Sequence, residues 1–296
     1  MSGKLKEVRE RIKSVNSTQQ ITKAMKMVSA AKLRKAQQAI TEMRPYANRL
    51  DKMLKNILSN LDGDTTSSFG VAREVNHAVV VVVTSNRGLC GAFNTNIIKA
   101  AIAAIEGEYA PLLKNGNLRI LCIGKKGYDI LRKRYGKENV IADYVNLFSD
   151  LSFGNVSTAS QFLMDEFAAG QIDKVTVCYG MFKNAGIQYP TTVQFLPVEK
   201  VVVEKSQEKS KADYIFEPGK EELLEDLIPT ILQTTFHKFL LDTHASEHGA
   251  RMTAMDKASE NAEELIKELK INYNKARQEA ITKELSEIVG GAAALG

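Results

Sequence analysis

Apolar residues recur at alternating steps of three and four along both ends of the chain, and this pattern constrains the fold more than any other feature. The N-terminal stripe, over residues 4 to about 60, contains Leu5, Val8, Ile12, Val15, Met25, Val28, Ala36, Ile40, Met43, Ala47, Leu50, Leu54, Ile57 and Leu61. A second helix is expected from about 219 nearly to 289, and its last part carries Met252, Met255, Ser259, Ala262, Ile266, Leu269, Tyr273, Ala276 and Ala280. Such helices would be roughly 90 and 105 Å long, so a compact domain of this size cannot contain them.

The two end segments also carry opposite charge. Residues 1–55 hold 14 Lys and Arg against 4 Asp and Glu, whereas residues 216–296 hold 9 against 15. Opposite charges and two heptad stripes predict that the helices wind around each other. We expect an antiparallel pair, because a domain between the helices lets the chain double back. A 3.5-residue repeat makes the winding left-handed.

Between these helices the pattern changes to alternating strands and helices, which predicts a small parallel α/β layer. We expect buried strands at 77–85, 117–124 and 174–182, an edge strand at 191–198, and helices at 94–109, 125–136 and 159–170. The polar segment 204–219 is typical of a linker. The expected organisation is an N-terminal coiled-coil helix at 1–62, an α/β domain at 63–205, and a linker with the C-terminal coiled-coil helix at 206–296.

Three cysteines, Cys90, Cys122 and Cys178, lie far apart in apolar or Gly-flanked settings. An odd number without a close pair argues against a disulfide framework or a zinc ribbon, so we expect buried thiols in a reducing compartment. The start "MSGKLKEVRE" lacks the apolar run of a secretory signal, and no stretch has the length of a membrane span. The chain should therefore be cytosolic or reach a membrane only through partners.

One segment, "THASEHGARM", has the H-x-x-E-H spacing of a class of zinc peptidases, with His244, Glu247 and His248. Catalytic zinc needs a third protein ligand and a walled cleft. The sequence after His248 is one extended helix that cannot curl back to supply that ligand. We expect these histidines on the surface of the helix or at a partner contact, and no metal site.

A second segment, "TSNRGLCGAFN", follows the first strand, where α/β folds often bind phosphate. Gly88 and Gly91 give only G-x-x-G, and neither G-x-G-x-x-G nor a G-x-x-x-x-G-K-[ST] loop occurs in the chain. A structural tight turn is the favoured interpretation, with Arg87 at an exposed tip available for a protein contact.

Two further features concern the ends. The basic stretch of the N-terminal helix from Lys4 to Lys35 has no aromatic residues for base stacking and has an acidic partner in the same chain, so nucleic-acid binding is not expected. The C-terminal sequence "EIVGGAAALG" has no charge after Glu287 and is composed of small residues. A solvated terminus usually carries charges, so this one is expected inside an apolar surrounding, where it could act as a pivot.

Long and specific motifs resemble one family over nearly the whole chain. "RIKSVNSTQQITKAMKMVSAAKLRKAQ", "RGLCGAFN", "SEHGARMTAMDKASENAEELI" and "YNKARQEAITKELSEIVGGAAAL" are similar, in this order, to the gamma subunit of rotary ATP synthases. "SEH" belongs to the family's pattern while His244 does not, so the peptidase spacing looks accidental. Asn86 and Gly249 stand where the family often has Asp and Ala, and Gly249 should weaken its helix by about 1 kcal/mol.

The resemblance implies an α/β fold with a left-handed antiparallel coiled coil and a central Rossmann-like domain at the base of a stalk. It implies a non-catalytic rotor shaft without cofactor or metal. Its partners would be three alpha and three beta subunits, the epsilon subunit and the membrane c ring, at the cytoplasmic face of a bacterial inner membrane. By the same resemblance, the residues that contact the alpha and beta ring are Met25, Arg87, Cys90, Arg251, Gly290, Gly291, Ala292, Ala293, Ala294 and Leu295. A nucleotide-binding α/β enzyme using residues 85–94, or a static coiled-coil scaffold, remain as alternatives.

Overall fold

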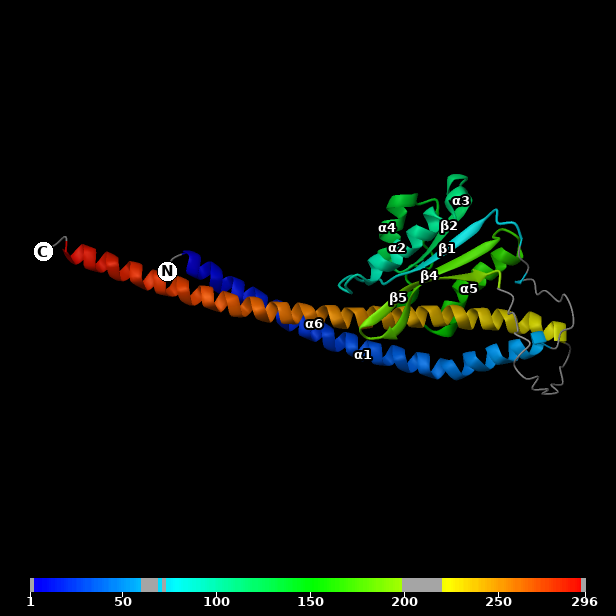
Figure 1. Ribbon diagram of the computed structural model, residues 1–296, viewed down its shortest axis with the longest axis horizontal. Coiled ribbons are helices and arrows are strands. Elements are labelled where there is room, and N and C mark those ends of the chain that lie inside the picture. The colour runs from blue at the N-terminus through cyan, green and yellow to red at the C-terminus, as the bar shows by residue number, and fades with distance from the viewer. Residues whose placement is uncertain (1–2, 60–68, 71–72, 199–219, 294–296) are drawn as a thin grey trace. The chain divides into compact units, whose positions relative to one another are not determined.

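The computed structural model describes residues 3–59, 69–70, 73–198 and 220–293. The expected linker, the end of the N-terminal stripe at Leu61, and Ala294 and Leu295 lie outside this part of the chain. Two long helices, α1 (Gly3–Ser59) and α6 (Lys220–Ala293), confirm the end helices that the sequence predicts (Figure 1). The chain forms two compact units, Met1–Ala30 with Arg251–Gly296, and Ala31–Ala250.

In the first unit α1 and α6 are held together along their length. Cross-helix contacts join Lys4 to Glu279 at 3.3 Å, Arg9 to Tyr273 at 2.8 Å, Thr22 to Ser259 at 2.7 Å, and Lys26 to Asp256 at 2.5 Å. The position on α6 falls as the position on α1 rises, so the helices run antiparallel, as predicted. Two of these contacts, Lys4 with Glu279 and Lys26 with Asp256, pair a basic group of α1 with an acidic group of α6, in line with the opposite charges of the two segments.

The seam between the helices agrees with the predicted stripe on α6 and corrects it on α1. The side chains buried in this unit include Leu5, Thr22, Ser29, Met255, Ser259, Ala262, Ile266, Leu269 and Ala276. Val28, which we assigned to the stripe, is 56% exposed. Steps of three and four from Leu5 lead to Thr22 and Ser29. Val28 directly precedes Ser29, so its side chain points about 100° away from the seam. The seam therefore includes a polar layer, and its 3.5-residue repeat imposes left-handed winding.

The second unit contains a five-stranded sheet in the order β3-β2-β1-β4-β5. Its strands are β1 (Ala78–Val83), β2 (Leu118–Ile123), β3 (Val140–Ile141), β4 (Lys174–Asn184) and β5 (Ile187–Leu196). The first four pair in parallel, and β5 pairs antiparallel with β4 at the edge that the sequence predicts. The predicted parallel layer is confirmed for the first four strands, and the sheet is mixed because only two residues link β4 to β5 and so short a link joins only antiparallel strands.

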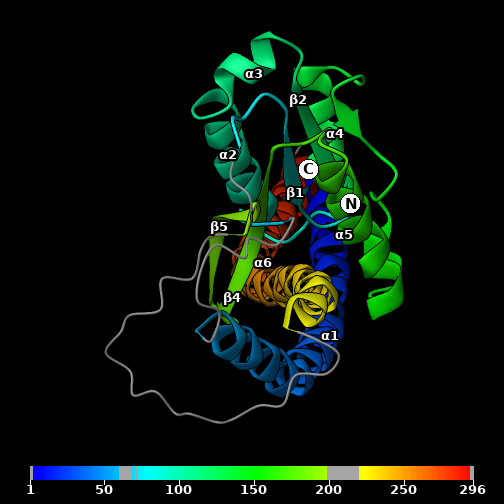
Figure 2. The same cartoon turned by 90° about the vertical axis from the view of Figure 1, so that its right-hand side faces the viewer.

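Helices cover both faces of this sheet, as Figure 2 shows for α2 on one side and α5 on the other. The helices are α2 (Phe93–Glu106), α3 (Ala110–Lys114), α4 (Lys125–Tyr135), the short 3-10 helix η1 (Leu147–Ser149) and α5 (Phe153–Ala168). One face packs against α2 and α4, and the other packs against α5 and the 228–240 part of α6. β1 is buried on both faces, which explains its unbroken valine run.

Candidate functional site

The last turns of α6 form an exposed apolar stripe. Ile281, Leu285, Ile288 and Val289 are between 49% and 67% exposed. Their spacing of four, three and one places them on one side of the helix. Gly290 and Gly291 follow with no atom within 4 Å of the position where a Cβ would lie. The predicted tip is thus helical as far as Ala293, and its large apolar groups contact nothing in this chain that would bury them.

Two predicted contact residues, Met25 and Arg251, belong to the coiled-coil unit. Met25 is half-buried beside Lys26, whose ammonium group pairs with Asp256. Arg251 is only 7% exposed, so its own chain covers most of the side chain. The sequence did not indicate this burial, because Arg is usually solvated. The partner contact of Arg251 stays a prediction, and little of the side chain is accessible for it.

The loop between β1 and α2 carries the other two predicted contact residues, Arg87 and Cys90. Arg87 is exposed, whereas Cys90 is 2% exposed and its sulfur accepts a hydrogen bond from Asn94 Nδ2 at 3.2 Å. Asn94 Oδ1 also accepts from the backbone N–H of Ser85 at 2.9 Å. The thiol therefore anchors the loop from inside. Leu89 in the same loop is 66% exposed and has a φ of 63°. The sequence analysis did not name it as a candidate contact residue, although a large apolar residue in a Gly-flanked loop is a signal for one.

The same loop caps the first turn of α4, where a phosphate could otherwise bind. Backbone N–H groups of Lys125, Lys126 and Gly127 donate to Asn86 Oδ1 at 3.1 Å, Ser85 O at 3.1 Å and Thr84 Oγ1 at 2.8 Å. Helix N-termini bind phosphate through such free N–H groups. Because these donors are used within the chain, the geometry disfavours a nucleotide at the start of α4. The structural interpretation of the G-x-x-G loop, which opens α2, stays a prediction.

The two histidines of the H-x-x-E-H segment lie on one face of α6, where His248 is buried and His244 is half-buried. His248 is 5% exposed and Glu247 7%. The Nε2 atoms of His244 and His248 are 3.1 Å apart, and the His244 ring stacks on Phe148 of η1 at 6.1 Å between centroids. The expected surface position was wrong for His248, because this part of α6 packs against the α/β layer, and the alternative of a partner contact stays a prediction. Among the residues described, no group of three His, Cys, Asp or Glu side chains could hold a metal.

A close approach of the β4–β5 hairpin explains the glycine at 249. A Cβ at this position would lie 3.2 Å from the Cα and O atoms of Ala185 and 3.4 Å from Gln188 Nε2. Nearby, Ser246 Oγ donates to the carbonyl of Gly180 at 3.0 Å. Packing against the hairpin, rather than helix geometry, therefore favours a residue without a side chain here.

No helix in the part of the chain that the structure describes is long and apolar enough to cross a membrane. The three cysteines are buried and free, as the sequence predicts.

Comparison with known proteins agrees with the fold. The family model described as ATP synthase matches residues 4–295. The ATP synthase gamma chains of Cytophaga hutchinsonii and Flavobacterium psychrophilum are 51% and 52% identical, each over 98% of both chains. A chain in the cryo-EM structure of the Euglena gracilis mitochondrial ATP synthase (OSCP/F1/c-ring) has a TM-score of 0.66 at 23% identity and covers 100% of this chain and 95% of that one. A chain in the central stalk/c-ring structure of the Tetrahymena thermophila mitochondrial ATP synthase has a TM-score of 0.55 at 24% identity, covering 81% and 99%.

Matches over nearly the full length, at about half identity, define a subunit of an ATP synthase. The chain belongs to the ATP synthase gamma family.

Proposed function

We propose that the chain is the central rotor shaft of a rotary ATP synthase. It couples proton flow through a membrane c ring to sequential conformational change of the catalytic beta subunits, for synthesis or hydrolysis of ATP. The observation that carries this proposal is the antiparallel pairing of the two ends of a chain from the gamma family. Two helices joined by a continuous seam and by ion pairs resist bending and twisting better than one helix, as a shaft requires.

Rotation changes the conformation of the ring only if the faces of the shaft differ. On α1 the side chains of Ile21, Met27 and Val28 are 59%, 71% and 56% exposed, whereas much of the remaining surface of the pair carries charged groups. Each beta subunit would meet apolar and charged faces in turn. Differential contact energies of this kind shift the populations of open and closed beta conformations. The shaft itself makes and breaks no covalent bond in this proposal.

The exposed stripe on the last turns of α6 supports a bearing at the tip. Burying Ile281, Leu285, Ile288 and Val289 in an apolar sleeve of the alpha and beta ring would remove them from water at about 25 cal/mol per Å². Residues 290–294 are glycine and alanine, which give few directional contacts, so the tip could turn within the sleeve. We propose that the α/β layer binds the epsilon subunit and the c ring, and that the chain is peripheral at the cytoplasmic face of the bacterial inner membrane.

A charge at Met25 tests the contact with beta. Met25→Lys should form an extra ion pair with acidic groups on beta, which leaves assembly intact and lowers coupling. The measurement is proton pumping per ATP hydrolysed by membrane vesicles. Met25→Leu, which keeps an apolar side chain of similar volume, is the matched control and should retain coupling. Unchanged proton pumping by the Met25→Lys vesicles would contradict this role.

A nucleotide-binding enzyme is the alternative from a different class. Calorimetric titration of the purified chain with ATP and Mg²⁺ separates the two. The rotor account predicts no saturable binding. Stoichiometric binding that is lost on changing residues 85–94 would favour the enzyme.

A further inference from the structure

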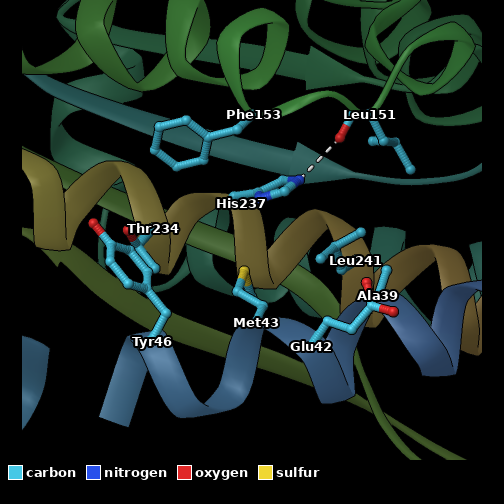
Figure 3. A pocket seen from close by; sticks show the side chains of 9 residues that line it. All are labelled: Ala39, Glu42, Met43, Tyr46, Leu151, Phe153, Thr234, His237 and Leu241. Carbon is cyan, nitrogen blue, oxygen red and sulfur yellow. Dashed lines mark hydrogen bonds between the residues drawn. The ribbon is translucent and has the colours of Figure 1, made fainter. Parts of the chain in front are cut away.

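A cavity of about 510 Å³ lies between α1, α6 and residues 151–153, where α5 begins, entirely within the second compact unit (Figure 3). This volume is within the usual range for small-molecule sites, about 300–1,000 Å³. The side chains that line it come from three parts of the chain that are far apart in sequence, and they are Ala39, Glu42, Met43, Tyr46, Leu151, Phe153, Thr234, His237 and Leu241.

The walls of the cavity are apolar and rich in rings. Phe153 contacts the His237 ring edge-on, with centroids 5.7 Å apart, and Figure 3 shows the His237 ring between Phe153 and Met43. Tyr46 is 51% exposed and extends from α1 toward α6. Flat rings and a thioether are favourable partners for another aromatic ring and for a cation. A flat aromatic body therefore fits these walls.

Four of the side chains that line the cavity are polar: His237, Thr234 and Glu42 offer acceptors, and the Tyr46 hydroxyl can donate or accept. His237 Nε2 lies 2.9 Å from the backbone carbonyl of Leu151, which can only accept, so Nε2 carries the proton. Burial holds the pKa of His237 below its usual 6.5, so at neutral pH the ring is neutral and Nδ1 is an acceptor. The hydroxyl of Thr234 donates to the carbonyl of Thr230 at 2.7 Å, which leaves its lone pairs for a donor.

Glu42 gives the cavity a negative charge. One of its carboxylate oxygens accepts from Gln38 Nε2 at 2.8 Å, and a carboxylate can accept further bonds. No Lys or Arg is among the residues that line this cavity. An anionic ligand would therefore face the Glu42 carboxylate with only the Tyr46 hydroxyl as a donor, whereas a positively charged donor would be matched by Glu42, His237 and Thr234.

From this complementarity we propose that the cavity binds a flat aromatic molecule that carries a protonated amine. The ring system lies among Met43, Phe153 and His237, and the amine donates to Glu42. Such a ligand bridges α1 and α6, so its binding stabilises the packing of the two helices against each other in this unit.

The test uses the full-length chain and 9-aminoacridine, a fluorescent flat aromatic cation. Equilibrium titration by fluorescence should give one saturable site. Acridine-9-carboxylate has the same ring system with a negative charge and should bind at least tenfold more weakly. Glu42→Gln removes the charge at constant size and should weaken binding of the cation about five- to tenfold, as expected for the loss of one charge-assisted hydrogen bond. Glu10→Gln, which removes an exposed charge elsewhere on α1, is the matched control and should leave binding unchanged.

Filling the cavity provides an independent variant. Circular dichroism shows whether the Ala39→Phe chain is folded like the unaltered chain. If the two spectra match, Ala39→Phe should abolish binding. If they differ, the Glu42→Gln titration alone tests the proposal. Equal binding of the cationic and anionic acridines would overturn the proposal. Unchanged affinity in Glu42→Gln, or the absence of a saturable site, would do the same.

Discussion

Two glycines of the same helix should respond oppositely to alanine. Replacing Gly by Ala inside a helix stabilises it by about 1 kcal/mol when the new methyl group meets no atoms. At Gly249 the methyl carbon would lie 3.2 Å from two backbone atoms of Ala185. The hairpin cannot easily move away, because Ser246 Oγ of α6 donates to the carbonyl of Gly180 on β4 at 3.0 Å and the N–H of Gly180 donates to Thr243 Oγ1 at 3.3 Å.

Overpacking of this kind costs typically about 1–3 kcal/mol, which exceeds the gain in helix propensity. We therefore expect Gly249→Ala to destabilise the chain by about 1 kcal/mol and to lower Tm by about 2–4 °C. Urea unfolding followed by circular dichroism measures the first quantity and scanning calorimetry the second.

Gly290 provides the comparison, since no atom lies within 4 Å of its Cβ position. Gly290→Ala should stabilise the last turns by up to about 1 kcal/mol and slow amide exchange there by up to about fivefold. If Gly249→Ala instead raised the free energy of unfolding by about 1 kcal/mol, the close packing of α6 against the hairpin would be refuted.

Three further predictions concern buried polar groups. Burial holds the pKa of His237 below its usual 6.5, so the unfolded chain binds this proton more readily and the stability of the folded chain should fall as the pH drops below about 6.5. The decrease of Tm between pH 7.5 and 5.5 should therefore be smaller in His237→Gln than in the unaltered chain. Equal decreases in the two chains would contradict this. Burial raises the pKa of Cys122 to about 12 and also raises that of Cys178. An aromatic disulfide reagent at pH 8 should therefore label neither thiol within minutes in the native chain, whereas it should label both thiols in denaturant. Rapid labelling of the native chain would contradict the buried positions. A double-mutant cycle with Thr22→Val and Ser259→Ala should give a coupling free energy of about 1 kcal/mol in urea unfolding, and a value near zero would mean that the 2.7 Å contact contributes nothing.

The long helices and the main strands could be predicted from the sequence because their signals are periodic and extended. The heptad stripe of α6 indicates a coiled-coil helix, and the valine run of β1 indicates a strand that is buried on both faces. β3 escaped prediction because two residues, Val140 and Ile141, carry no period. The assignment of Val28 to the seam was wrong because Thr22 and Ser29 occupy the buried positions there. A pattern of apolar residues alone does not include these two polar side chains.

Tertiary packing decided what the sequence could not. Polar residues such as His248 and Arg251 read as exposed, yet α6 buries them, and no local pattern distinguishes the two cases. Gly249 is explained only by the hairpin that reaches it. The cavity has no sequence signal at all, because three distant segments form it. By contrast, the residues expected to meet the ring follow from motifs specific to the family, and their contacts remain predictions.

Rotation during catalysis is the most direct test of the proposed shaft. A bead or gold rod is attached to a cysteine introduced at the exposed Lys137, in a complex of this chain with its alpha and beta subunits fixed to a surface. The account predicts that the probe turns in one direction while ATP is hydrolysed and stops when ATP is exhausted. A probe that stays at a fixed angle during full hydrolysis would show that the paired ends of this chain form a static scaffold.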